Sequence, residues 1–153
     1  MKTFDAVFRG SPEELTRALD GGIDPNVRDR DGRTPLFHAV IDGQRELAEI
    51  LVSHGAQSNL QDYLGKAPLH YAVQEHRSEI AEFLLQHGAE VDVKDKNGNT
   101  PLSDAVFNSR GRGELIKLLL AHGADRNKKN DHGVSPLDLA KSIGNYDVTQ
   151  FFK

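Results

Sequence analysis

Apolar and polar positions along this chain of 153 residues follow a pattern that repeats at an almost constant step. A proline-leucine pair occurs four times, with an alanine four residues after each proline, and consecutive prolines are separated by 33, 33 and 35 residues. The prolines are Pro35, Pro68, Pro101 and Pro136, the leucines are Leu36, Leu69, Leu102 and Leu137, and the alanines are Ala39, Ala72, Ala105 and Ala140. Four copies in phase predict a repeated structural unit.

Each copy carries the signals of a turn that leads into a helix. In GRTPLFHA, Thr34 can accept a hydrogen bond from a free backbone N–H of the first helical turn, and Pro35 suits a position where its missing N–H costs nothing. Ahead of them, Asp29 can accept from its own backbone two residues on, and Gly32 can adopt the positive φ of a tight turn. The equivalent residues in later copies are Asp62, Asp95 and Asn130, and Gly65, Gly98 and Gly133.

A second landmark closes an apolar run in three of the copies. It is the triplet HGA, which begins at His54, His87 and His122. The glycine predicts a helix end of the Schellman type, and the histidine is expected to interact with the last carbonyls and with the helix dipole. The unit is therefore predicted to be turn, helix, turn, helix.

The step and the motif together resemble the ankyrin-repeat family, whose repeat of 33 residues carries the signature T-P-L-H-x-A. The match is best in APLHYA, which keeps the histidine at His70 but has Ala67 in place of threonine; the other copies read TPLFHA, TPLSDA and SPLDLA. The resemblance implies an all-α solenoid of helix-turn-helix units joined by β-turn or hairpin fingers, with about ten helices and strand content limited to the turns. It also implies that His70 links its helix to a turn.

The resemblance covers nearly the whole chain, so we expect a single domain. We divide it into an N-terminal capping unit, three full repeats and a C-terminal unit, with the bounds 1–26, 27–59, 60–92, 93–127 and 128–153.

The two ends of the array differ from its middle. In the first unit, Glu14 and Arg17 occupy places that are apolar in the internal second helices, as expected for a cap that faces solvent. The final YDVTQFFK is interpreted as a shortened second helix, with Phe151 aligned to Ile50. The stretch SRGRG, residues 109–113, is interpreted as a two-residue enlargement of a helix-helix turn, which accounts for the step of 35.

Composition and motifs argue against several chemical functions. The chain is 37% hydrophobic and 27% charged with a net charge of -4, which favours a soluble protein; it has no apolar run long enough to span a membrane and no signal peptide, so we expect a cytoplasmic location. The chain lacks cysteine, which excludes disulfide and thiolate chemistry.

Metal and catalytic sites are not expected either. The histidines of the HGA triplets lie at one position of successive repeats, and helices packed about 8 to 10 Å apart cannot bring their nitrogens within about 2.1 Å of a shared zinc ion. SRGRG lacks the lysine and the length of a phosphate loop, and no carboxylate lies in a recognisable catalytic setting. We therefore expect no enzymatic activity, no metal and no cofactor.

Ankyrin arrays usually bind proteins through their turn tips and the inner face of the first helices, so the resemblance implies a partner-binding surface there. Its predicted residues are Arg30, Arg33, Ile41, Tyr63, Leu64, Lys66, Gln74, Glu75, Lys96, Asn97, Phe107, Asn108 and His132. Tyr63 and Leu64 would expose apolar groups on a turn tip, where a folded monomer gains little from them. Phe8, Ile41 and Phe107 could form an interrupted apolar seam, although any one of them could instead pack against its own repeat.

Charge is distributed unevenly between the turn segments and the rest of the chain. The turn segments 27–33, 60–66, 93–99 and 128–134 together carry a net charge of +3, whereas the whole chain carries -4. A basic edge on an acidic protein favours a protein partner whose acidic surface faces the turns. Nucleic acid is a weaker candidate, because aspartates alternate with the basic residues and no aromatic stacking ladder is present.

We therefore predict a monomeric, non-enzymatic module that binds a protein partner as an adaptor or an inhibitor. A narrower alternative is that the chain resembles the small ankyrin proteins that act as immunity proteins and neutralise a cognate bacterial toxin. An enzyme or a metal protein is a third possibility that no motif supports.

Overall fold

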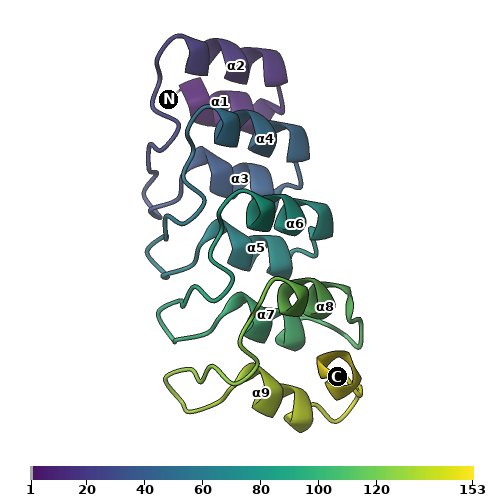
Figure 1. Ribbon diagram of the computed structural model, residues 1–153. Coiled ribbons are helices and arrows are strands. Elements are labelled where there is room, and N and C mark those ends of the chain that lie inside the picture. Colours follow the sequence, from purple (N-terminus) through teal and green to yellow (C-terminus); the bar gives the residue numbers. More distant parts are fainter. Residues whose placement is uncertain (1) are drawn as a thin grey trace.

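The computed structural model describes residues 2–153, which form one row of stacked helix pairs (Figure 1). The pairs are α1 (Lys2–Arg9) with α2 (Pro12–Asp20), α3 (Pro35–Ile41) with α4 (Arg45–Ser53), α5 (Pro68–Gln74) with α6 (Ser78–Gln86), and α7 (Pro101–Phe107) with α8 (Glu114–Ala121). The last unit joins α9 (Pro136–Ser142) to a short 3-10 helix, η1 (Thr149–Phe152). Residues 2–153 contain no strand, so the all-α prediction is confirmed.

Contacts between successive pairs build two parallel rows of helices. In the first row α1, α3, α5, α7 and α9 each contact the next, and in the second row α2, α4, α6 and α8 do the same. Long loops project from one side of these rows (Figure 1). This arrangement is the solenoid that the repeat pattern predicts.

The core consists of apolar residues that recur once per repeat. Leu36, Leu69 and Leu102 in the first row are completely or almost completely buried, as is Leu84 in the second row. The half-buried Ile50 packs against the same core from α4. Each pair therefore covers the apolar face of its neighbour.

The helix starts agree with the sequence analysis at two of the copies and differ at another. Ser135 caps α9 by accepting from the N–H of Asp138, and Thr100 caps α7 through a longer bond to the N–H of Ser103. Thr34 does not cap α3, which corrects our expectation: the N–H of Phe37 donates to the backbone carbonyl of Thr34 over 3.0 Å, not to its hydroxyl. The buried Thr34 hydroxyl has no hydrogen-bond partner in residues 2–153.

The helix ends follow the predicted Schellman geometry. Gly55 has φ +94°, and the N–H of Ala56 donates to the carbonyl of Leu51 over 2.9 Å. The ring of His54 donates through Nδ1 to the carbonyl of Ile50 over 2.8 Å, so the predicted contact with a last carbonyl is confirmed there. His87 makes the equivalent bond to Phe83, whereas the ring of His122 makes none in the described chain.

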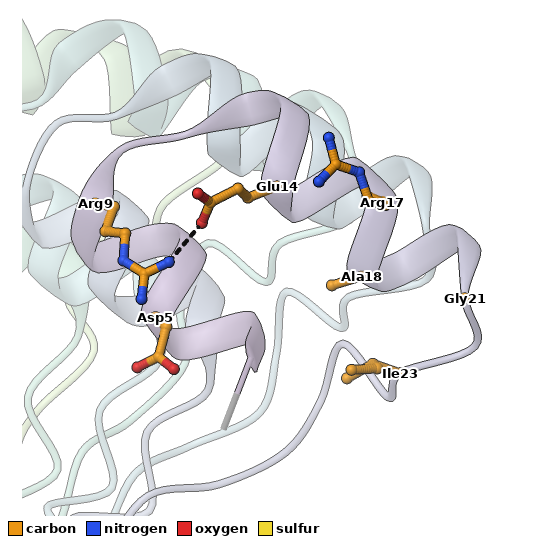
Figure 2. A pocket seen from close by; sticks show the side chains of 7 residues that line it. All are labelled: Asp5, Arg9, Glu14, Arg17, Ala18, Gly21 and Ile23. Carbon is orange, nitrogen blue, oxygen red and sulfur yellow. Dashed lines mark hydrogen bonds and ion pairs between the residues drawn. The ribbon is translucent and has the colours of Figure 1, made fainter.

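The N-terminal unit has one apolar side and one polar side. Leu15 and Leu19 on α2 are buried, while Arg17 is exposed. Glu14 forms an ion pair with Arg9 over 2.8 Å, across the polar hollow between α1 and α2 (Figure 2). The solvent-facing end of the solenoid is thus covered by charged groups.

The C-terminal unit ends in a short second helix, as we expected. Its last turn is the 3-10 helix η1, in which Phe152 is buried. The enlarged turn lies between α7 and α8, as expected, and the structure shows what it contacts: a Cβ at Gly113 would collide with the ring of Phe151, and one at Gly111 with the ring of Tyr146. The glycines of SRGRG therefore let the C-terminal segment pack closely against the last full repeat.

The difference between core and cap gives a stability prediction. Leu84→Ala should lower the free energy of unfolding by about 2 to 5 kcal/mol, because it leaves a cavity between helices. Arg17→Ala should lower it by less than about 0.5 kcal/mol, as is usual for an exposed site. Urea unfolding followed by circular dichroism measures both values, and equal losses would contradict the assignment of the cap.

Candidate functional site

Four loops, here called fingers 1 to 4, form one edge of the molecule (Figure 1). They comprise residues 27–33, 60–66, 93–99 and 128–134. A backbone N–H in each of fingers 2 to 4 donates to a carbonyl of the finger before it, over 2.9 to 3.0 Å: Tyr63 to Asp31, Lys96 to Leu64 and Asp131 to Asn97. These bonds hold the fingers in a fixed spacing, so side chains at their tips are displayed in register.

Each finger is closed by its own Asp or Asn side chain, as the sequence predicted. In finger 1, one oxygen of Asp29 accepts from the N–H groups of Asp31 and Arg33. Asp62, Asp95 and Asn130 accept two equivalent bonds in the later fingers. The turn conformation is therefore fixed by local bonds within each finger.

The second carboxylate oxygen of Asp29 ties finger 1 to the first helix of its repeat. The Nε2 of His38 lies 2.8 Å from this oxygen. Burial acts to raise the pKa of Asp29, but the bonds from His38, Arg33 and Asp31 outweigh it and hold the pKa below its ordinary value.

Finger 2 uses a different set of donors for the same purpose. The second oxygen of the buried Asp62 accepts from the Tyr71 hydroxyl and, over 3.4 Å, from Nε of Arg33. Burial and the bond to Asp62 raise the pKa of Tyr71 to about 12, so the phenol keeps its proton and donates it.

Two predicted partner-binding residues take part in this structural contact. The Arg33 guanidinium lies 4.9 Å from the centre of the Tyr71 ring and also donates to its hydroxyl. The Lys66 ammonium lies 5.6 Å from the same ring. Both side chains already have neighbours within the fold and are half-buried.

The apolar groups that we expected at the surface are exposed. Tyr63 is 58% exposed, Leu64 54% and Phe107 76%. Phe8, which is also exposed, packs edge-on against His38. Ile41 differs, because it is half-buried and packs against the core, so it contributes little to the apolar seam.

A groove with a volume of about 680 Å³ brings together residues from fingers 2, 3 and 4 and from α5, α7 and α9. It is lined by seven of the predicted residues, namely Lys66, Gln74, Glu75, Asn97, Phe107, Asn108 and His132. Arg30, Tyr63, Leu64 and Lys96 are exposed on the fingers but do not line it, and neither do Arg33 and Ile41. The predicted binding residues omitted two charged groups of the groove wall, Asp104 on α7 and Asp95, which the sequence analysis named only as a turn residue.

Comparison with protein families accounts for the repeat. Residues 3–95 match the family model described as ankyrin repeats (3 copies), and residues 97–131 match the model described as ankyrin repeat. The chain belongs to the ankyrin-repeat family. Ankyrin repeats are generally modules of protein-protein interaction and typically have no catalytic role. No curated protein matches the chain.

Two further properties of the ankyrin structure concern metals and membranes. Within residues 2–153, no three His, Cys, Asp or Glu side chains are placed so that they could share a metal ion. No helix in this part of the chain has both the length and the apolar content that crossing a membrane requires.

Removal of one hydroxyl tests the link between finger 2 and its helix. Tyr71→Phe should lower the free energy of unfolding by about 1 to 3 kcal/mol, because the buried Asp62 loses a donor. Tyr63→Phe is the matched control, since the Tyr63 hydroxyl makes no hydrogen bond in the described chain and its ring is exposed. Thermal and urea unfolding measure the difference; a Tyr71→Phe protein as stable as the control would show that the bond does not hold the finger.

Proposed function

We propose that this ankyrin-repeat chain is a non-enzymatic adaptor or inhibitor that binds a protein partner through the tips of its fingers and the adjoining groove. One observation carries the proposal: Phe107, Tyr63 and Leu64 are more than half exposed on this surface. The ring of Tyr63 packs with one side on Gly32 of finger 1 and leaves the rest of its surface free. The fold gains little from the exposed parts of these groups, and exposed aromatic residues are enriched where proteins meet.

The charge of the fingers supports a partner with an acidic surface facing their tips. Arg30 and Lys96 are exposed there and form no ion pair within residues 2–153. The four fingers together carry +3 on a chain of net charge -4. Such a patch steers an acidic protein toward the edge and speeds its association.

Capture of the partner from a native extract by the immobilised chain, followed by mass spectrometry, tests the proposal. A partner that is itself a toxin enzyme would identify the inhibitor as an immunity protein. A partner that brings a second protein into the complex would identify an adaptor.

Two aromatic truncations test the position of the interface. Tyr63→Ala and Phe107→Ala should each weaken partner binding by at least about 1 to 2 kcal/mol, mainly through faster dissociation, because central aromatic residues carry much of an interface's energy. Surface plasmon resonance measures this change, and thermal unfolding should be nearly unaffected because both side chains are exposed.

Matched controls lie on the second helices. Glu49→Ala on α4 and Glu82→Ala on α6 should leave binding unchanged. Loss of binding in these controls, with Tyr63→Ala and Phe107→Ala still binding normally, would place the partner on the opposite face.

Charge reversal at Lys96 tests electrostatic steering separately. Lys96→Glu should slow association more than it speeds dissociation, and the effect should shrink at high salt because the side chain is exposed. Association rates measured at low and at high ionic strength decide this. A salt-independent loss, expressed only in dissociation, would contradict steering.

A further inference from the structure

The first helix of each repeat faces its finger with a residue nine positions after the finger's Asp or Asn. In repeat 1 this residue is His38, which lies 2.8 Å from the second oxygen of Asp29. In repeat 2 it is Tyr71, which donates to Asp62. Both helices thus supply a hydrogen-bonding partner for the finger carboxylate.

In repeat 3 the same position holds a carboxylate, Asp104. The first oxygen of Asp95 accepts the usual two backbone bonds, from Asn97 and Asn99. Its second oxygen has no donor among residues 2–153, because Asp104 brings a second negative charge where His38 and Tyr71 bring hydrogens.

The neighbouring basic side chains do not donate to this second oxygen of Asp95. Lys66 is equivalent to Arg33, but its ammonium lies over the Tyr71 ring and forms no ion pair with Asp95 or Asp104 in the described residues. Both ring nitrogens of His70 already have partners, since its Nδ1 accepts from the N–H of Ala67 and its Nε2 donates to the carbonyl of Asn99. The one side-chain bond to Asp104 in this part of the chain comes from the amide of Gln74, over 3.0 Å.

The surroundings of the two carboxylates favour a positively charged group. Both line the groove. Burial raises the pKa of Asp104 and outweighs the opposite effects of His70, of the bond from Gln74 and of Lys66, while the negative charge of Asp95 adds a smaller rise. A cation placed between them would offset the cost of holding two carboxylates close together. Phe107, one turn after Asp104, offers an exposed ring beside them for the aliphatic part of a long side chain.

We propose that this groove takes up a lysine or arginine side chain of the protein partner, whose charged end binds Asp95 and Asp104 and supplies the donor that His38 and Tyr71 supply to the finger carboxylates of the preceding repeats. The inference rests on the proposed function, because it names the chemistry that the same surface recognises. An acidic surface against the finger tips and one basic side chain in the groove together define the partner.

The probe for this inference is a random phage-displayed peptide library selected on the immobilised full chain. Selected peptides should share a lysine or arginine, and replacing it by glutamine should weaken binding to the wild-type chain by about tenfold or more, since hydrogen bonds between charged groups are strong. Asp104→His, which copies repeat 1, should weaken the original peptide by the same factor. The glutamine peptide and the Asp104→His chain combined should bind no more weakly than either change alone allows, as expected when both changes remove the same contact.

Two control variants accompany the histidine variant. Asp104→Asn keeps the size of the side chain and removes its charge, and it should also lose the preference for a basic residue. Glu82→Gln removes a carboxylate outside the groove and should change nothing. Thermal unfolding of each variant shows that the fold is retained.

The outcomes separate the two proposals. Peptides that lose binding on Phe107→Ala but share no basic residue, or that bind Asp104→His as well as the wild type, would overturn the cation site and leave the proposed function standing. A library that yields no binder, or only binders insensitive to both Tyr63→Ala and Phe107→Ala, would contradict both.

Discussion

Each helix pair of this protein buries its apolar residues against the next pair, and every other feature of the structure depends on that contact. A single pair of short helices cannot enclose a core, so the leucines that follow each proline become buried only when pairs stack. Stacking in turn fixes the distance between successive fingers, which allows one backbone hydrogen bond between each finger and the next. The spacing of the fingers is therefore regular because the core is repetitive.

Repetition also separates structural positions from variable ones. The residues that close a finger or start a helix are similar in every copy, whereas the tips and the helix positions that face them differ from copy to copy. The contact between finger and first helix shows this most clearly: it is made by a histidine in one repeat, by a tyrosine and an arginine in the next, and is replaced by two carboxylates in the third. The last arrangement does not help the fold, and it lines the groove beside an exposed phenylalanine.

Much of the fold could be predicted from the sequence because its signals are local and repeated. The step between prolines, the turn glycines and the HGA triplets each determine a short segment, and their phase determines the stacking. Departures arose where two local groups compete or where distant segments meet. The Thr34 hydroxyl lost its expected role because the Thr34 carbonyl accepts the same N–H, and Phe151 packs on Gly113 in a 3-10 turn that no local pattern indicates.

The candidate site was less predictable than the fold. Exposure of Tyr63 and Phe107 followed from their place in the repeat, but the groove did not, since it depends on where three fingers and three helices leave space. Asp104 could have been found by comparing residues nine positions after each finger's Asp or Asn, although the direction taken by Lys66 is visible only in three dimensions.

Hydrogen-deuterium exchange of the chain, alone and bound to its captured partner, tests most directly whether the finger edge and the groove form the interface. The account predicts slower exchange on binding in fingers 2 to 4 and at the end of α7, with α4, α6 and α8 unchanged. Protection confined to those second-row helices, with the fingers exchanging as in the free chain, would contradict it.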